Sequence, residues 1–378
     1  MNDNSLLAIC EQISALDLKL LSLLAKRRTL DLARSKINSQ CPIGYKTREH
    51  DLLERLMAEG QKLKVDSFYV TRMFQMITED PVLMQQATLQ SNLNHSVDHS
   101  ARIAFLGPEG SYSHLAAKQY GARYFNHVVE CGCHKFIDIA QLVETGQAEY
   151  GILPIENSSS GSINEVYDLL QHTHLSLVGE VTIPIDHCLL ANSKLRLDQI
   201  ETIYSHPQPF QQCSQFLTNF PQWNIEYCES TASAMEKVAQ LNCSTAAALG
   251  GGQGGAIYGL QVLKHNLANQ QKNITRFIVL ARNAIEVIEQ VPAKTMMIMA
   301  IRQKSHALVK ALLVLRTHAI VMTQLKSRPI PDKPCKEMFY IDVKANLRSV
   351  QMQKALQEIQ GLTCSLKILG CYPSQNIV

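Results

Sequence analysis

Residues 150–161 read Tyr-Gly-Ile-Leu-Pro-Ile-Glu-Asn-Ser-Ser-Ser-Gly, a short apolar run that ends in a turn of polar and small residues. Similar apolar runs, each followed by a glycine, serine or proline turn, occur at residues 102–106, 202–205, 244–249 and 276–281. Helical stretches lie between the runs, and this alternation predicts an open α/β sheet. Ligands of such folds bind at the carboxyl ends of strands, so the polar turns are the candidate site.

Four strand-end motifs carry the polar side chains of this segment. They are Gly107-Pro-Glu-Gly-Ser-Tyr-Ser-His114, Pro154-Ile-Glu-Asn-Ser-Ser-Ser-Gly161, Ser205-His-Pro-Gln-Pro-Phe-Gln-Gln-Cys213 and Asn273-Ile-Thr-Arg-Phe277. Each motif alone is an ordinary turn, but together and in this order they resemble those of prephenate dehydratases. The resemblance covers residues 102–283. It implies a dehydratase domain of two α/β lobes with the active site in the cleft between them, similar to periplasmic binding proteins.

The resemblance also implies the residues that act. Thr275 would hydrogen-bond the departing oxygen, Glu156 and Asn157 would polarise or orient the same region, and Ser205 and Gln212 would position the substrate. Prephenate loses carbon dioxide from its ring and hydroxide from C4, so the enzyme must hold two carboxylates and protonate a poor leaving group. Backbone N–H groups and serine hydroxyls can hold carboxylates without a metal. We therefore expect neither a cofactor nor a metal.

Two features of this segment stay open at the level of sequence. Arg276 could clamp a substrate carboxylate or form a structural salt bridge beneath Thr275. Residues 250–255 include five glycines where the family usually carries a serine and an acidic residue. No Lys-Ser or Lys-Thr pair follows, so a nucleotide site is not predicted, and we interpret the run as a loosened family turn.

The first 90 residues follow a different pattern. Apolar residues recur at spacings of three, four and seven, which places them on one stripe of a long helix: Ile9, Ile13, Leu16, Leu20, Leu23 and Leu30. A second helix is predicted from residue 48 to 59 with Gly60 as its cap, and a third from Asp66 past residue 85. Three helices of this length bury little core alone, so we expect a homodimer or a higher homo-oligomer. Residues 91–101 are polar and predict a linker.

These helices resemble the all-α chorismate mutase domain that precedes such dehydratases in bacterial bifunctional enzymes. The matching pieces are Ile13-Ser-Ala-Leu-Asp17, Leu24-Ala-Lys-Arg-Arg28, Arg48-Glu49 and Asp51-Leu-Leu-Glu-Arg-Leu56. The family pattern implies that five residues bind chorismate: Arg27, Lys36, Arg48, Glu49 and Gln85.

Four departures from the mutase pattern fall on this predicted pocket. Cys10 replaces an arginine, Tyr45 an aspartate and Pro81 a serine. Arg27 and Lys36 are nine residues apart, which is roughly 180° around a straight helix. Two alternatives follow: a working mutase, or a dimerising helical domain with weak or absent mutase activity.

Residues 294–373 predict the order strand, helix, strand, strand, helix, strand, which is ferredoxin-like. This α+β segment resembles the ACT regulatory domain that binds phenylalanine in these enzymes. The resemblance implies effector contacts from two short motifs: Ala307, Leu308 and Val309, and Ser327, Arg328 and Pro329. His306 replaces a family glycine and Lys326 an acidic residue. We expect weakened or lost feedback inhibition, although a domain that still binds phenylalanine is the alternative.

The bulk composition fits a multidomain enzyme. The 378 residues carry a net charge of +3, too balanced to predict a nucleic-acid partner. Eleven scattered cysteines and the absence of a basic n-region predict reduced thiols and a cytoplasmic location, and no run is long enough to predict a membrane helix. The expected substrates are prephenate and chorismate. A non-catalytic, two-lobed amino-acid-binding sensor is the alternative from another class.

Overall fold

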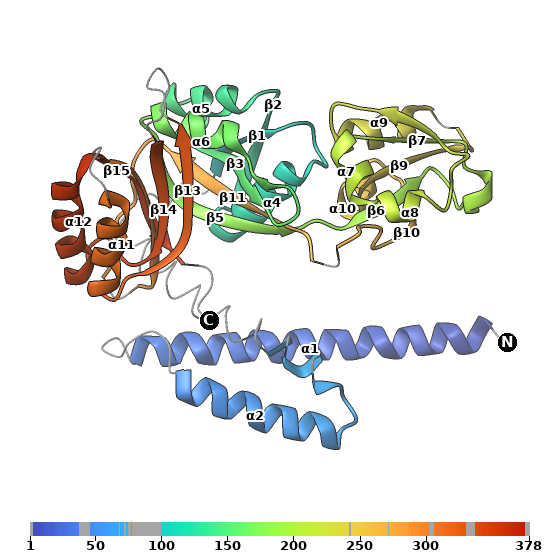
Figure 1. Ribbon diagram of the computed structural model, residues 1–378. Helices are drawn as coiled ribbons and strands as arrows, with labels where there is room; N and C mark the ends of the chain where they lie inside the picture. Colours follow the sequence, from blue (N-terminus) through green and yellow to red (C-terminus); the bar gives the residue numbers. More distant parts are fainter. Residues whose placement is uncertain are drawn as a thin grey trace. The chain divides into compact units, whose positions relative to one another are not determined.

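The computed structural model of the chain describes residues 3–37, 46–67, 69–71, 73–74, 77, 100–241, 243–270, 272–289, 291–301, 306–329 and 337–374. The chain divides into two compact units (Figure 1). The first comprises Met1–His95 with Ile288–Pro292 and Pro373–Val378, and the second comprises Ser96–Val287 with Ala293–Tyr372. In the described part of the chain, none of the helices is long and apolar enough to cross a membrane.

The first unit is helical, as predicted. Helix α1 (Asp3–Ile37) is unbroken and about 50 Å long, and α2 spans Lys46–Lys62. Gly60 does not cap α2, because the helix continues past it and the glycine packs against Val70, where a Cβ would come within 2.8 Å of a methyl group. Asp66 accepts the N–H of Tyr69 at 3.0 Å, so the predicted N-cap of the third helix is confirmed.

The second unit begins with a sheet in the strand order β2-β1-β3-β11-β5, with β4 paired to β3. Its strands are β1 (Ser100–Leu106), β2 (His127–Cys133), β3 (Tyr150–Asn157), β4 (Gly161–Ser162), β5 (Ser176–Pro184) and β11 (Ile274–Ala281). Its helices are α4 (Tyr112–Tyr124), α5 (Phe136–Glu144) and α6 (Asn164–His172). We call this sheet with its helices the first lobe.

The second lobe has the strand order β10-β6-β9-β7-β8. Its strands are β6 (His187–Ala191), β7 (Thr202–Ser205), β8 (Asn224–Tyr227), β9 (Ala246–Gly251) and β10 (Gln261–Lys264). Its helices are η1 (Leu197–Gln199), α7 (Pro207–Gln212), α8 (Ser214–Leu217), α9 (Thr231–Leu241) and α10 (Gly252–Ile257). The chain passes between the lobes twice, from β5 to β6 and from β10 to β11, so the predicted two-lobed α/β fold is confirmed.

The C-terminal segment forms a four-stranded sheet in the order β13-β14-β12-β15. Its elements are β12 (Ala293–Ile301), α11 (Ala307–Thr317), β13 (Val321–Pro329), β14 (Glu337–Lys344), α12 (Val350–Leu362) and β15 (Thr363–Pro373), which confirms the predicted order. One apolar core joins this sheet to the first lobe, because Leu153 and Tyr167 of the lobe share a cluster with Met296, Tyr340 and Leu369. The predicted boundary between residues 102–283 and 294–373 stays a prediction.

Candidate active site in the dehydratase segment

The end of β3 and the start of β11 lie side by side and set the geometry of the site. Their register pairs Thr275 with Asn157 and Arg276 with Glu156. Successive side chains of a strand point to opposite faces of the sheet. Asn157 and Thr275 therefore share one face, and Glu156 and Arg276 share the other.

On the first of these faces, the Asn157 carboxamide is held in a single orientation. Its Nδ2 donates to Thr275 Oγ1 at 2.9 Å and to Asn273 Oδ1 at 2.7 Å. Its Oδ1 accepts the backbone N–H groups of Ser159 and Ser160 at 3.0 and 2.9 Å. Because Thr275 Oγ1 accepts from Asn157, the threonine hydroxyl keeps its own proton to donate to a ligand.

The network continues from this face into the second lobe through Gln212 at the end of α7. Gln212 Oε1 accepts from Asn273 Nδ2 at 3.2 Å and lies 2.6 Å from His187 Nε2. Burial lowers the pKa of His187 below its ordinary value, so the imidazole is neutral at pH 7 and its Nε2 is the donor. Asn273 and Gln212 thus bridge the two lobes with neutral groups.

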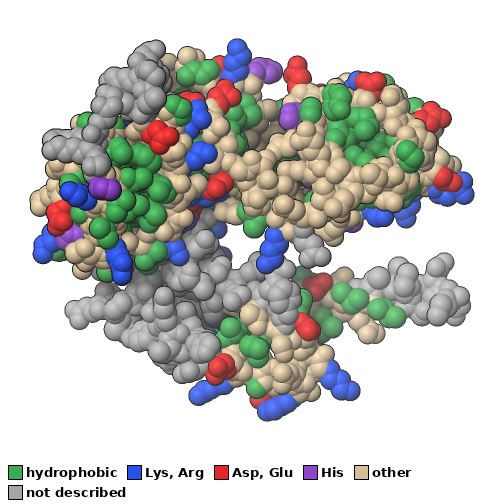
Figure 2. Space-filling view, in the orientation of Figure 1, with side chains coloured by type: hydrophobic (Ala, Val, Ile, Leu, Met, Phe, Trp, Pro, Cys, Tyr) green, Lys and Arg blue, Asp and Glu red, His purple; other side chains and the backbone are tan. Residues whose placement is uncertain are grey.

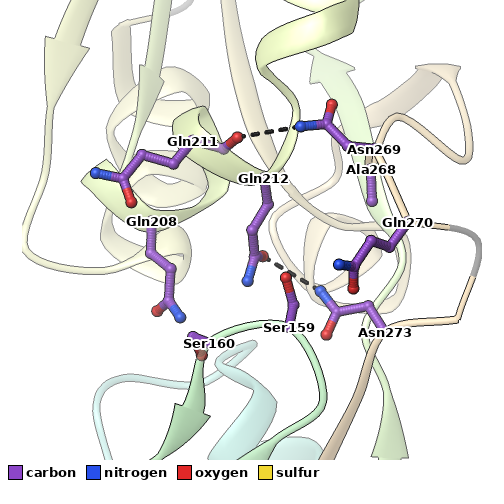
Figure 3. Close-up of a pocket in the computed structure, with 9 residues that line it drawn as sticks. All are labelled: Ser159, Ser160, Gln208, Gln211, Gln212, Ala268, Asn269, Gln270 and Asn273. Carbon is purple, nitrogen blue, oxygen red and sulfur yellow. Dashed lines mark hydrogen bonds between the residues drawn. The ribbon is translucent and has the colours of Figure 1, made fainter.

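A cavity of about 230 Å³ opens beside this bridge (Figure 3). Its lining residues are Ser159, Ser160, Gln208, Gln211, Gln212, Ala268, Asn269, Gln270 and Asn273. In Figure 3 the two serines come from the loop after β3, and Gln208 and Gln212 of α7 point toward them from the other lobe. Apart from Ala268 the lining residues are polar and uncharged, which suits a ligand held by hydrogen bonds.

Of the five predicted dehydratase residues, the structure brings together Asn157, Thr275 and Gln212. Ser205 is buried at the end of β7 and donates its hydroxyl to the backbone oxygen of Leu249 at 2.6 Å, which ties β7 to β9. Glu156 does not lie with the other residues, since it accepts Gln324 Nε2 at 2.9 Å on the opposite face of the sheet.

Arg276 lies on the same face as Glu156, and the structural alternative for it is confirmed. Its guanidinium contacts Asp342 Oδ2 at 2.6 Å, Gln324 Oε1 at 2.5 Å and Glu180 Oε2 at 3.6 Å. Lys294 binds the other oxygen of Glu180 at 2.5 Å. Two cations and two anions form this buried cluster, which attaches the C-terminal sheet to β5 and β11.

Sequence reasoning missed Asn273 and His187. Asn273 had a usable signal, because it stands two residues before Thr275 and period 2 places both on one face. His187 had none that we recognise, since it begins an apolar strand and meets Gln212 only through the fold.

The glycine run at residues 250–255 is a site of close approach and not a loosened turn. A Cβ on Gly254 would clash with the carbonyl oxygen of Gly110, which itself has φ +79°. Tyr258 donates its hydroxyl to the carbonyl of Glu109 at 2.5 Å beside this contact. The two lobes therefore touch backbone to backbone here, and larger residues would separate them.

Few of the predicted chorismate-binding residues fall in the described part of the chain. Arg27 Nη1 donates to the backbone oxygen of Ile77 at 2.8 Å. Helix α1 continues through Ile37, so Arg27 and Lys36 are nine residues apart on one helix. The structure describes the backbone but not the side chains of Cys10, Lys36, Arg48 and Glu49. Tyr45, Pro81 and Gln85 lie wholly outside the described part of the chain.

The predicted effector residues occupy the start of α11 and the end of β13. Ala307 is buried and Leu308 is half-buried, whereas Val309 is 53% exposed. Ser327 and Pro329 are exposed on β13, and Arg328 between them pairs with Asp168 of α6 at 2.6 Å. His306 has φ +72°, a conformation that glycine adopts without strain and that histidine adopts less readily.

Comparison with known proteins adds to this geometry. Residues 103–285 match the prephenate dehydratase family and residues 9–86 match the type II chorismate mutase family. The chain is 62% identical over 378 residues to a bifunctional chorismate mutase/prephenate dehydratase of Enterobacter agglomerans, covering 100% of this chain and 98% of that one. The chain belongs to the bifunctional chorismate mutase/prephenate dehydratase family.

Two solved structures resemble the chain over 72% of its length. One is GqqA, described as a novel type of quorum-quenching acylase, with a TM-score of 0.65 and 28% identity over 72% of this chain and 98% of that one. The other is a prephenate dehydratase from Arthrobacter aurescens in complex with L-phenylalanine, with a TM-score of 0.65 and 23% identity over 72% and 90% of the chains. The second shows a common fold alone.

Proposed function

We propose that this chain converts chorismate to prephenate and prephenate to phenylpyruvate in L-phenylalanine biosynthesis. The dehydratase step is the better supported of the two in the described residues. The observation that carries it is the Thr275 hydroxyl, whose oxygen accepts from Asn157 and whose proton is left to donate, in a network that reaches the polar cavity through Asn273.

In the dehydratase step, the C–C bond to the ring carboxylate breaks and carbon dioxide leaves. The electron pair of that bond enters the ring, and the C4–O bond breaks as the ring becomes aromatic. Thr275 donates its proton to the departing C4 oxygen, which leaves as water, and the threonine regains a proton from solvent. Such proton donation in the transition state contributes typically about 10²–10⁴-fold to the rate.

The remaining residues of this face position the substrate. Gln212, held by His187 and Asn273, presents its amide to the cavity. Ser159 offers its hydroxyl group from the first lobe, whereas Ser160 Oγ donates to Asn157 Oδ1 at 3.0 Å and can only accept from the substrate. Ser205 would act indirectly by fixing the end of β7, and Glu156 would hold the other face of β3 to the C-terminal sheet through Gln324.

The experiment that separates this proposal from a non-catalytic sensor uses the purified full chain with prephenate. We expect phenylpyruvate and carbon dioxide to accumulate together over many turnovers. A sensor would bind the ligand with saturation and release it unchanged, and that result would refute the dehydratase proposal.

We propose that the chain converts chorismate more slowly than it converts prephenate. Arg27 keeps a place on the described helix, but Cys10, Tyr45 and Pro81 replace residues of the family pattern. An arginine–carboxylate contact is among the stronger hydrogen-bonded pairs, so its loss weakens binding of a dicarboxylate. Purified protein that consumes chorismate as fast as prephenate would contradict the proposed impairment.

A homodimer is proposed from exposed apolar surface. The predicted stripe of α1 is open to solvent in the single chain: Ile9, Ile13, Leu16, Leu20, Leu23 and Leu30 are 47–64% exposed. Exposed apolar side chains also gather on the C-terminal domain (Figure 2), from α11 and β13: Val309, Leu313, Val321, Met322 and Leu325. Contiguous patches of this kind mark interaction surfaces. We expect the dimeric enzyme to act in the cytoplasm.

Feedback by phenylalanine is proposed to be weak or absent. His306 places an imidazole at the start of α11 where the family has a glycine, and Lys326 reverses a charge on β13. The guanidinium of Arg328 is already paired with Asp168. The dehydratase rate in the presence of micromolar phenylalanine tests this directly, and strong inhibition would contradict it.

A further inference from the structure

Three side chains with metal-ligating atoms converge outside the lining of the cavity, on the far side of His187 in the sequence of contacts from Gln212. They are Asp186 between β5 and β6, Cys188 in β6, and His265 after β10. Cys188 Sγ lies 3.3 Å from Asp186 Oδ2 and 3.4 Å from His265 Nδ1. The last pair, His265 Nδ1 and Asp186 Oδ2, is 3.7 Å apart.

We propose that Asp186, Cys188 and His265 bind a zinc ion, with water as the fourth ligand. Zinc bonds of about 2.3 Å to sulfur and about 2.0–2.2 Å to nitrogen and oxygen, at tetrahedral angles, separate the ligand atoms by about 3.3–3.6 Å. The three observed separations differ from these values by a few tenths of an ångström at most. Thiolate, imidazole and carboxylate together also favour zinc over magnesium or calcium, which prefer oxygen ligands.

The backbone holds the ligands in this arrangement. The N–H of Asn266 donates to Asp186 Oδ1 at 3.1 Å, which orients the carboxylate and leaves Oδ2 for the metal. The N–H of Leu267 donates to the carbonyl of His187 at 3.0 Å. Asn266 has φ +56°, a left-handed turn that asparagine tolerates. Hydrogen bonds to the outer atoms of ligands are the usual support of a zinc site.

The sulfur has the surroundings of a metal ligand as well as of a buried thiol. Cys188 is fully buried in β6. Gly252 lies close, since a Cβ there would come within 3.5 Å of Sγ. Without metal the thiol donates to Asp186, and a bound zinc ion would displace that proton.

The position of the site suggests a structural role. Asp186 belongs to one of the two passages between the lobes and His265 begins the other. His187, which lies between two of the ligands, is bonded to Gln212 of the cleft. Zinc would therefore clamp the two passages together beside the bridge that holds Gln212.

The test is a titration of reduced, metal-free, full-length protein with Co²⁺, followed by absorption spectroscopy. We expect one Co²⁺ per chain with a thiolate-to-metal charge-transfer band and the intense visible bands of tetrahedral coordination. Added Zn²⁺ should abolish these bands by displacement. Cys188→Ala should lose the charge-transfer band, and His265→Gln should weaken Co²⁺ affinity by more than about tenfold, the lower bound for losing even a supporting group.

Matched controls separate this site from adventitious binding by other cysteines. Cys371→Ala removes another buried thiol that accepts a backbone N–H, from Leu347 at 3.4 Å, and should leave the spectrum unchanged. His265→Gln is informative even if Cys188→Ala misfolds, since the His265 side chain is 63% exposed. An absent charge-transfer band in the wild type, or unchanged affinity in His265→Gln, would overturn the proposal.

Discussion

The two faces at the junction of β3 and β11 carry opposite kinds of chemistry. On one face, Asn157 and Thr275 belong to a neutral network that ends in a polar cavity. On the other, Glu156 and Arg276 contact polar and charged groups of the C-terminal sheet, and the ionic cluster there is almost fully buried. Adjacent residues in the sequence thus serve separate purposes because a strand alternates its side chains.

The difference shows how the same strands can be both reactive and rigid. A proton donor must face substrate with its proton free, whereas a buried ion pair must have its partners fixed. Placing the two on opposite faces lets the ionic cluster fix β11 without placing charge beside the reacting oxygen. Substitutions on the two faces should therefore affect different measurements.

The largest effect is expected for Thr275→Ala. Removing the proton donor should lower kcat by about 10²–10⁴-fold. The free energy of unfolding should change by only about 1 kcal/mol, the net value of one hydrogen bond. Steady-state phenylpyruvate formation and urea unfolding measure the two. Thr275→Ser keeps the hydroxyl and should retain most of the activity, and an inactive serine variant would argue against proton donation.

Asp342→Asn should produce the converse result. It leaves the half-buried Arg276 without its closest anion, and breaking a buried ion pair typically costs about 3–5 kcal/mol of stability. The kcat of the protein that remains folded should change little, because Asp342 contacts β11 on the face opposite to Thr275. Glu149→Gln is the control, since its pair with Arg102 is exposed and worth about 0–1 kcal/mol. Equal losses in both variants would contradict the buried cluster as a stabilising unit.

Asn273→Leu should have an intermediate effect on the bridge between the lobes. Asn157 Nδ2 loses the oxygen that accepts from it, and Gln212 Oε1 loses the N–H that donates to it, while the side-chain volume at position 273 is roughly kept. Leaving buried polar groups unpaired costs about 1–3 kcal/mol, so kcat/KM should fall by about 5- to 150-fold. Asn219→Leu, at an exposed asparagine of the second lobe, serves as the control. No change in kcat/KM would show that the bridge does not position Gln212.

The smallest expected effect is that of His306→Gly. The left-handed backbone at this position costs a non-glycine residue about 1–2 kcal/mol, and part of that strain should be recovered on substitution. Removing the imidazole should also make the dehydratase more sensitive to phenylalanine. Thermal unfolding and inhibition curves measure both, and a variant less sensitive than the parent would contradict the proposed crowding.

The sequence predicted most of the architecture. Alternation of apolar runs with helices identified the α/β segment, and the C-terminal element order was correct. Three of the five dehydratase residues meet in the structure because their motifs end neighbouring elements. The sequence grouped Glu156 with Asn157 as an active-site residue. Glu156 instead contacts Gln324, which is 168 residues away, and nothing near Glu156 in the sequence predicts that contact. The convergence of Asp186 and Cys188 with His265 also depends on the fold, since 77 residues separate Cys188 from His265.

The most direct test of the separation between faces compares two neighbouring residues, Glu156 and Asn157, by kcat for prephenate. Glu156→Gln keeps an oxygen for Gln324 and should change kcat by less than tenfold, about 1.4 kcal/mol. Asn157→Asp cannot donate to Thr275, whose hydroxyl would turn to the new carboxylate, so kcat should fall by about 100-fold or more. A large loss in Glu156→Gln at unchanged stability, with near-normal activity in Asn157→Asp, would contradict the assignment of the reactive face.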